Sequence, residues 1–372
     1  MAPVLSSKQR ILEMIRDNAF VSQQELAERL GITRSAVASH IGQLIRDHRL
    51  LGRAYVLPGA EPILVVGGAN LDRLAKGFGA IVMGTSNPVS VEESFGGVAR
   101  NVAENLARLG LPVRLMTAVG DDLPGAALLQ QARHLGIDTG ATLTVTGCPT
   151  GTYTALLQPE GELVLALADM AVMDRLTLAA LHQRRWHWAS TRFRVVDCNL
   201  RSEVLAALID DSRRQGAKLV IVGVSEPKMT RLPESLEGVS TLILNAGELA
   251  ARVGRALPDP EALVAACRQV QAQGALGVVV TLGDQGVLCA SGAGEAKHFP
   301  APKVAIVDVT GAGDAFSAGV VASLASPNRA PEELFQACLV GLRLAALTLG
   351  SRASVAASLT PAFLQEDETA AL

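Results

Sequence analysis

The stretch Asp308-Val309-Thr310-Gly311-Ala312-Gly313-Asp314-Ala315-Phe316 ends a short β-branched run and begins a segment of small and apolar residues that suits a tightly packed helix. Two glycines at such a strand-to-helix junction let the backbone turn and keep side chains away from the first helical turn. The free N–H groups of that turn and the positive end of the helix dipole form a site for an anion. A carboxylate beside it, Asp314, could take a proton from a hydroxyl group that attacks the anion. The stretch therefore favours phosphoryl transfer with Asp314 as the general base.

The same residues also have a structural interpretation, in which a glycine-rich turn is followed by an acidic helix cap. The stretch lacks the Gly-Lys-Ser/Thr of a Walker loop, and it lacks the third glycine of a dinucleotide-binding fingerprint. The choice between catalysis and capping therefore depends on the rest of the chain.

Composition limits the class of protein. A chain of 372 residues with 49% hydrophobic residues and 35 glycines fits an α/β protein with an additional domain. An aromatic content of 3% argues against a surface that stacks single-stranded nucleic-acid bases. No apolar run approaches about 18 residues and no signal-peptide core is present, so we expect no membrane span. The five scattered cysteines are typical of reduced thiols in a cytoplasmic protein.

Residues 1–57 have the pattern of a winged helix-turn-helix domain. Residues 1–60 hold 8 Lys and Arg against 5 Asp and Glu, a net charge of +3, whereas the remainder holds 25 against 31, a net charge of −6. The spacing predicts three helices, the second beginning after Ser22 and the third after Thr33, with Gly31 at the turn between them. The alternating segment 52–57 predicts the wing. Residues 58–62 form a proline-containing linker.

The third predicted helix offers an outward polar face that could meet phosphates and base edges of duplex DNA. The alternative is a three-helix domain that contacts proteins. One head with a net charge of +3 would bind DNA weakly, so we expect a homodimer that presents two heads. The candidate DNA-binding residues are Arg34, Ser35, Ser39, His40 and Gln43.

Residues 63–362 alternate between strand-like and helix-like segments. This rhythm predicts an α/β domain with a mostly parallel sheet sandwiched by helices. Two strand-like interruptions, 74–95 and 141–168, do not fit that sheet and are interpreted as a small β flap. Residues 363–372 resemble a frayed tail.

Polar residues follow several predicted strands, at the edge of the sheet where α/β proteins bind ligands. Asn70 and Asp72 follow the first strand of the domain, and Gly96-Gly97 opens a helix that carries Asn101 one turn later. Paired glycines permit a substrate to approach the backbone, although a plain helix start is equally consistent with this motif. A later strand is followed by Asn245 and Glu248, an amide and a carboxylate suited to a phosphate-bound Mg²⁺. Another is followed by a tight turn suited to nucleotide phosphate, with Thr281, Gly283 and Gly286.

These motifs, in this order, give residues 63–350 a resemblance to the ribokinase-like (phosphofructokinase-B type) carbohydrate kinases. The resemblance implies that Asp314 deprotonates the sugar hydroxyl group and that residues 311–313 (Gly311, Ala312 and Gly313) bind the γ-phosphate of ATP. It implies that Glu248 and Asn245 position Mg²⁺ and its waters, and that the ATP site is lined by Asn245, Thr281, Gly283 and Gly286. It further implies substrate contacts from Asn70, Asp72, Gly96, Gly97 and Asn101, and a potassium site at Asp308 and Thr310.

Within that family, several segments are most similar to pseudouridine kinases, namely Ser86-Asn87-Pro88, the Gly96-to-Asn101 helix start, Ala168-Asp169-Met170, Asp197-Cys198-Asn199 and Val224-Ser225 followed by Lys228. The similarity implies that Asp169, Asn199 and Lys228 meet a pyrimidine edge or the ribose. Each has a structural alternative: a flap-end cap for Asp169, a helix N-cap for Asn199 and a solvated charge for Lys228. Gly223-Val224 departs from the Asp-Pro that relatives usually carry.

We therefore expect an ATP-dependent nucleoside or sugar kinase, most similar to those that phosphorylate pseudouridine at its 5′-hydroxyl, attached to a DNA-binding head. One alternative is a transcription regulator whose kinase-like body senses a nucleoside. Another is a kinase for a different nucleoside such as inosine. The carboxylates at 248 and 314 favour catalysis, because a sensor would need neither a base nor a metal ligand.

Overall fold

The computed structural model describes residues 6–17, 21–50, 61–189, 191–292, 295–325 and 334–365. Tertiary contacts divide the chain into two units. The first comprises Met1–Glu61 together with Arg184–Thr191, and the second comprises Pro62–Gln183 together with Arg192–Leu372.

The N-terminal head contains the three predicted helices, α1 (Ser7–Asp17), α2 (Gln23–Leu30) and α3 (Arg34–Arg46). The caps lie where the sequence predicts them: the Ser22 hydroxyl accepts from the Glu25 N–H, and the Thr33 hydroxyl accepts from the Ala36 N–H. Gly31 closes α2 in the left-handed region, with φ of +65°. The helices enclose their own apolar core, which includes Ile11, Ile15, Leu26, Val37, Ile41 and Leu44. The predicted wing, 52–57, and most of the linker lie outside the described residues.

The body is built on an eight-stranded sheet whose strands, in order, are β14 (Glu295–Phe299), β13 (Val287–Ser291), β12 (Gly277–Thr281), β11 (Thr241–Asn245), β10 (Lys218–Val222), β9 (Phe193–Asp197), β1 (Ile63–Val66) and β4 (Val113–Met116). Neighbouring strands from β12 to β4 are parallel, which confirms the predicted sheet. β13 and β14 add an antiparallel hairpin at one edge, which the sequence analysis did not predict.

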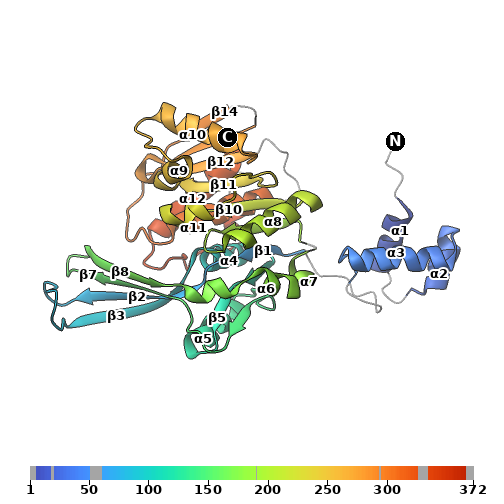
Figure 1. Cartoon of the computed structure of the whole chain (residues 1–372), viewed down its shortest axis with the longest axis horizontal. Coiled ribbons are helices and arrows are strands. Elements are labelled where there is room, and N and C mark those ends of the chain that lie inside the picture. Colours follow the sequence, from blue (N-terminus) through green and yellow to red (C-terminus); the bar gives the residue numbers. More distant parts are fainter. Residues whose placement is uncertain are drawn as a thin grey trace. The chain divides into compact units, whose positions relative to one another are not determined.

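Helices cover both faces of this sheet (Figure 1). One face packs against α4 (Val98–Arg108), α11 (Ala312–Ala325) and α12 (Leu334–Leu349), with Val65, Val195, Val220, Ile243 and Val279 facing that core. The other face packs against α8 (Ser202–Gln215), α9 (Ala246–Val253) and α10 (Pro260–Ala272). The other α-helices described in the body are α5 (Leu123–His134), α6 (Leu178–Gln183) and α13 (Ala362–Gln365), whereas α7 (Arg185–Trp188) belongs to the first unit.

The flap differs from its predicted bounds. It is a four-stranded sheet of β3 (Val89–Gly96), β2 (Asn70–Gly77), β7 (Thr152–Leu157) and β8 (Leu163–Asp169), so it begins at residue 70 rather than 74. The assignment of residues 141–146 to the flap is wrong, because β6 (Leu143–Val145) pairs in parallel with β5 (Ala118–Gly120). A short alternating segment does not itself specify which strand it will pair with.

A strand predicted just before the glycine stretch is also absent. The structure describes residues 304–309 and assigns them no strand. The Val307 N–H donates to the carbonyl of Leu349 at the end of α12, so this segment bonds to a helix terminus instead of a neighbouring strand.

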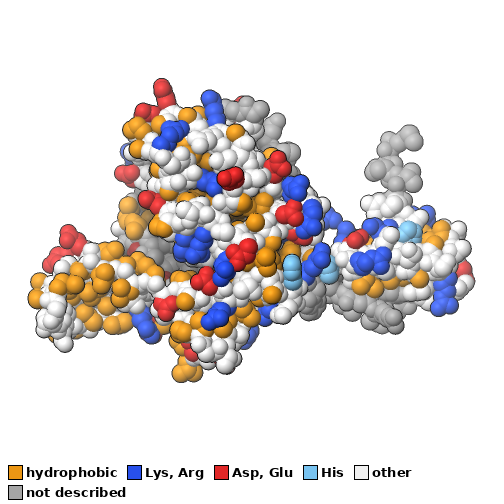
Figure 2. All heavy atoms as spheres, viewed as in Figure 1, with side chains coloured by type: hydrophobic (Ala, Val, Ile, Leu, Met, Phe, Trp, Pro, Cys, Tyr) orange, Lys and Arg blue, Asp and Glu red, His pale blue; other side chains and the backbone are white. Residues whose placement is uncertain are grey.

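Apolar side chains gather on the flap surface (Figure 2). Cross-strand pairing aligns Ala75, Val91, Leu156 and Leu165 in one row across the four strands. Several large apolar residues of the flap are exposed, including Leu74, Val91, Leu163, Leu165 and Leu167. Among the helices in the described parts of the chain, none is both long and apolar enough to cross a membrane.

Candidate active site

The candidate site lies where β1 and β9 end and α4 and α11 begin. Asp197, the last residue of β9, is 1% exposed, and its carboxylate accepts three backbone N–H bonds. One oxygen accepts from Gly68 at 2.8 Å and Ala99 at 3.1 Å, and the other accepts from Asn199 at 2.8 Å. This carboxylate therefore fixes the turn after β1 and the first turn of α4. Asp197 had no predicted role, although an acid at the end of a buried strand is a usable sequence signal.

The two glycines before α4 are required by close packing. Gly97 has φ of +99°, and a Cβ there would lie 2.5 Å from the Gly68 carbonyl oxygen. At Gly96 a Cβ would lie 1.9 Å from Oδ2 of Asp72. Asp72 also accepts a hydrogen bond from Nδ2 of Asn70 at 2.5 Å. The predicted substrate residues on β2 and at the start of α4 are thus brought together.

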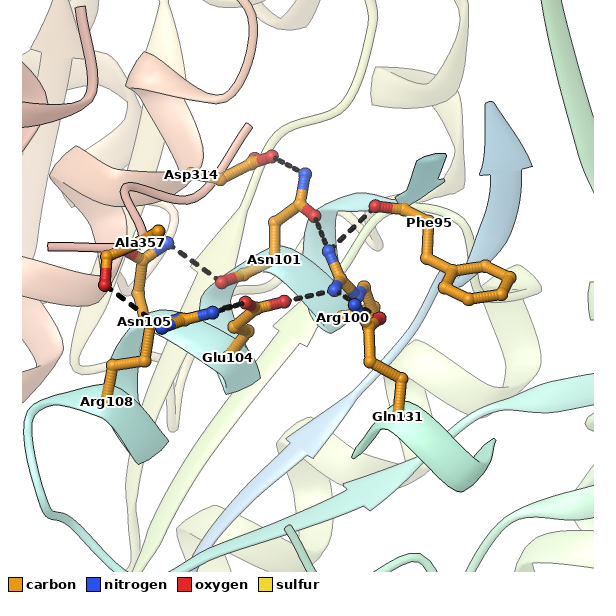
Figure 3. A network of polar contacts seen from close by, with 9 residues as sticks. All are labelled: Phe95, Arg100, Asn101, Glu104, Asn105, Arg108, Gln131, Asp314 and Ala357. Carbon is orange, nitrogen blue, oxygen red and sulfur yellow. Dashed lines mark hydrogen bonds and ion pairs between the residues drawn. The ribbon is translucent and has the colours of Figure 1, made fainter. Parts of the chain in front are cut away.

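Asp314 occupies the first turn of α11, and its side chain points toward Asn101 of α4 (Figure 3). Nδ2 of Asn101 donates to Oδ2 of Asp314 at 2.7 Å, joining residues that are 213 positions apart in the sequence. Gly311, just before the helix, has φ of +80°, and a Cβ there would lie 2.1 Å from the carbonyl oxygen of Ser354. A Cβ at Gly313 would meet nothing within 4 Å, so the first turn of α11 has open space beside it.

The environment of Asp314 makes its carboxyl group a weaker acid than usual. Burial raises the pKa of Asp314 to about 7, and the nearby carboxylates of Asp197 and Asp72 act in the same direction. The hydrogen bond from Asn101 and the charge of Arg100 oppose the rise. A carboxyl group with this pKa can exchange a proton near neutral pH, which is the property required of a general base. Burial likewise raises the pKa of Asp72.

A buried polar network surrounds the Asn101 side chain (Figure 3). Arg100 is 6% exposed and Glu104 is 3% exposed. One terminal nitrogen of Arg100 donates to Oδ1 of Asn101, and the other donates to Glu104, which also pairs with Arg108. This network was not predicted from the sequence, because the spacing of Arg100, Glu104 and Arg108 along one face of a helix is also that of an ordinary solvated face.

Two of the predicted substrate residues contact each other. Nζ of Lys228 donates to Oδ1 of Asn199 at 2.5 Å, and burial lowers the pKa of Lys228 while the charge of Asp197 opposes that change. Lys228 is therefore not a freely solvated charge, and Asn199 is not the N-cap of α8, which is Arg201. Asp169 differs from both. It is exposed and its carboxylate accepts from the Ala171 N–H, as its structural alternative predicts.

The Asn245 and Glu248 pair forms a complete capping box at the start of α9. The Glu248 carboxylate accepts from the Asn245 N–H at 2.9 Å, and the Asn245 side chain accepts from the Glu248 N–H at 2.8 Å. Burial raises the pKa of Glu248, and the charge of Glu226 adds to the rise. A Cβ at Gly223 would lie 2.1 Å from Oε2 of Glu248, so a larger residue at 223 would require the Glu248 carboxylate to move from its capping position.

The residues predicted for the nucleotide lie on neighbouring strand ends. Asn245 of β11 is in register with Thr281 of β12, whose hydroxyl group donates to the Leu244 carbonyl at 3.4 Å. Gly283 and Gly286 lie at a turn after β12, with φ of +64° and +92°. Among the residues that the structure describes, no group of three or more His, Cys, Asp and Glu side chains is arranged to hold a metal ion.

The predicted cation and DNA residues are not members of this network. The Asp308 carboxylate accepts from the Thr310 N–H at 2.7 Å in the exposed segment before α11. On α3, the side chains of Arg34, Ser35, Ser39 and Gln43 are exposed. His40 is only half-buried, but its Nδ1 is buried and has no hydrogen-bond partner among the described residues.

Comparison with known proteins agrees with this geometry. The uncharacterized sugar kinase YeiI of Escherichia coli (strain K12) is 33% identical over 319 residues, which cover 85% of this chain and 87% of the relative. The pseudouridine kinase of the same strain is 31% identical over 258 residues, which cover 69% of this chain and 82% of the relative. The solved structure of a carbohydrate kinase from Agrobacterium tumefaciens is 30% identical to this chain and superposes on it with a TM-score of 0.70. The match covers 82% of this chain and 96% of that kinase chain.

Family comparison covers both parts of the chain. Residues 61–361 match the pfkB family of carbohydrate kinases, and residues 6–49 match the winged helix-turn-helix DNA-binding family. The predicted ribokinase-like α/β fold and the predicted N-terminal winged helix-turn-helix domain are thereby confirmed. The chain belongs to the pfkB family of carbohydrate kinases and carries an N-terminal winged helix-turn-helix domain.

Proposed function

We propose that the chain transfers the terminal phosphoryl group of ATP to the 5′-hydroxyl group of a nucleoside, and that this nucleoside is pseudouridine. The observation that carries the proposal is the 2.7 Å hydrogen bond between Asn101 and Asp314 beside the N-terminus of α11. The bond holds a carboxylate of raised pKa in the first turn of a helix whose free N–H groups favour a phosphate.

In the proposed mechanism Asp314 accepts the proton of the substrate hydroxyl group while the substrate oxygen bonds to phosphorus and the bond to ADP breaks. Oδ2 of Asp314 accepts from Asn101, and Oδ1 is assigned to the substrate. The N–H groups of the first turn of α11 receive the charge that develops on the transferred phosphoryl group. Most of the catalysis is thus positioning and electrostatic stabilisation.

The nucleotide is assigned to the neighbouring ends of β11 and β12, next to Asn245, Thr281 and Gly283. Oxygen ligands suit Mg²⁺, and the buried Glu248 carboxylate, with one oxygen bonded to the Asn245 N–H, fits a contact made through water. When bound, Mg²⁺ would neutralise phosphate charge. The carboxylate of Asp308 is assigned, with Thr310, to a monovalent cation such as K⁺.

Pseudouridine is proposed because the pair formed by the buried Asn199 and the half-buried Lys228 supplies both donors and an acceptor. Lys228 is tied to Asn199, and Asn199 is tied through its N–H to Asp197, so the pair is held rigidly to the end of β9. A Cβ at Gly68 would lie 2.4 Å from Nδ2 of Asn199, which places the pair beside the turn that precedes Asn70. Support also comes from the 31% identical pseudouridine kinase.

A substrate panel tests this proposal. ADP release should be measured with ATP, Mg²⁺ and pseudouridine, uridine, inosine, ribose or fructose as acceptors, and we expect the highest kcat/KM with pseudouridine. Lys228→Met should lower kcat/KM for pseudouridine by about tenfold to a hundredfold, because a partly buried polar contact is lost, while ribose should be much less affected. A higher kcat/KM with inosine would reassign the substrate, and turnover of none would favour a sensor.

We propose that the head binds duplex DNA through the exposed face of α3. Four of the five predicted residues on this face are exposed, and residues 6–49 match a DNA-binding family. We also propose a homodimer, which would present two heads. The row of apolar residues across the flap, described above, supports an assembly that covers this surface.

Fluorescence anisotropy of the full chain tests the DNA proposal, with a duplex from upstream of its own operon and a scrambled duplex of equal composition. We expect tighter binding to the operon duplex and a steep loss of affinity with salt. Arg34→Ala should weaken binding by about tenfold or more. Lys8→Ala is the matched control, because it removes the same charge from α1, where Lys8 pairs with Asp47. Equal binding to both duplexes, or equal effects of the two variants, would contradict the proposal.

A further inference from the structure

We propose that Arg100 is a positioning residue that sets the orientation of the Asn101 amide and thereby holds Asp314 in its ionised, proton-accepting form. The inference rests on the proposed role of Asp314. The juxtaposition that carries it is a continuous chain of bonds from Arg100 to Oδ1 of Asn101 at 2.9 Å, and from Nδ2 of Asn101 to Asp314 at 2.7 Å (Figure 3).

The two ends of the Asn101 side-chain amide differ in hydrogen-bonding character. The amide can present either its NH₂ group or its carbonyl oxygen to a neighbour, and only the NH₂ group attracts a carboxylate. Arg100 is always a donor, so the side of Asn101 that faces it must be the oxygen. Without Arg100 the amide could turn and place Oδ1 against Asp314, where two acceptors would repel each other. Arg100 therefore decides which end meets the base.

Hydrogen bonds to three elements hold the Arg100 side chain in place. The terminal nitrogen that donates to Asn101 also donates to the carbonyl oxygen of Phe95, at the root of the flap strand β3, at 2.7 Å. The other terminal nitrogen donates to Glu104 and to Oε1 of Gln131 at 2.9 Å. The guanidinium fork is therefore fixed by α4, α5 and β3 together, and the flap root and Asn101 share one nitrogen. A lysine could not reproduce this set of bonds.

The charged groups around Asp314 act on its protonation in opposite directions. The groups that act on Asp314 come from three elements: Asp72 on β2 and Asp197 on β9 favour its protonated form, and Arg100 on α4 opposes them. Arg100 acts twice, through its own charge and through the donor that it keeps in place on Asn101. Removing it should therefore favour the protonated form of Asp314, which cannot accept a proton.

The pH dependence of kcat/KM tests this inference, with pseudouridine or the panel compound of highest kcat/KM as acceptor. Arg100→Met should move the acidic limb upward by about one pH unit. It should lower kcat at pH 7 by roughly tenfold to a hundredfold and leave the KM of the acceptor little changed. Arg100→Lys, which keeps the charge without the fork, should give an intermediate shift.

Arg108→Gln is the matched control. Arg108 also pairs with Glu104 in the same buried cluster, so each single variant leaves Glu104 with one arginine partner. The contacts of Arg108 run to Glu104 and to the carbonyl oxygen of Ala357, away from Asn101 and Asp314. Arg108→Gln should therefore leave the acidic limb in place. If the acidic limb of the kcat/KM profile lay at the same pH in Arg100→Met, Arg108→Gln and the unmodified chain, the inference would be overturned.

A double variant separates this inference from the proposed function. If Arg100 acts through Asp314, Arg100→Met should cost little further turnover in an Asp314→Asn background, where the base is already absent. Full additivity would overturn the role of Arg100. High activity of Asp314→Asn alone would instead remove the proposed base, whatever Arg100 does. If Arg100→Met does not fold, the pH of the acidic limb in Arg100→Lys tests the inference, and an unshifted limb in that variant would overturn it.

Discussion

Asp314→Asn should lower kcat by about 10²–10⁴-fold, because asparagine has the shape of aspartate but cannot accept the substrate proton. The variant should keep the contact with Asn101, since the asparagine oxygen can still accept from Nδ2. We therefore expect the KM values of ATP and the acceptor to change little, and ADP release under saturating substrates measures the loss. Near-normal turnover of Asp314→Asn would contradict the proposed base.

The pH profile provides the second half of this prediction. With a pKa of about 7, Asp314 is protonated at acidic pH, so kcat/KM of the unmodified chain should rise with pH through about 7. A raised folded-state pKa also favours folding at acidic pH, and that contribution is lost progressively as pH rises from the ordinary aspartate value of 3.8 to about 7. Asp314→Asn removes the buried charge and should raise the free energy of unfolding at pH 8 by about 1–3 kcal/mol, measured by urea denaturation.

How far the sequence predicts this molecule depends on whether a feature is local. The caps at Ser22 and Thr33 and the turn at Gly31 are local patterns, and the structure contains them. The partner of a short strand is not local, and the misassigned segment 141–146 shows this. Its β-like alternation is real, but the choice between β5 and the flap depends on tertiary contacts that a single sequence does not reveal.

The same distinction between local patterns and tertiary contacts applies to the residues of the candidate site. Asp314, Asn101 and Asp72 could be selected because each follows a glycine-rich or strand-end motif. Arg100 and Glu104 could not be selected, because a charged pair spaced four residues apart usually lies on a solvated helix face. Only the burial of α4 between α11 and the sheet converts that pair into part of the site. Glu248 was predicted only as a metal ligand. Its hydrogen bond to the Asn245 N–H was not predicted, because that bond depends on where the helix begins.

Gly311→Ala should lower the free energy of unfolding by about 2–4 kcal/mol and kcat by about a hundredfold. Gly311 has φ of +80°, and the added methyl group would lie 2.1 Å from the carbonyl oxygen of Ser354. The backbone must move, and it carries the first turn of α11 with it. Urea denaturation and steady-state ADP release measure the two effects.

Gly313→Ala is the matched comparison, two residues further along the same turn. Its methyl group would meet nothing within 4 Å, so stability should be unchanged or rise by up to about 1 kcal/mol, as for alanine in place of glycine in a helix. The methyl group would nevertheless occupy the open space assigned to the transferred phosphate, so the KM of ATP should rise and kcat should fall. If Gly313→Ala left both parameters unchanged, the open space beside α11 would not be where the phosphoryl group is transferred, because a group bound there must meet the added carbon.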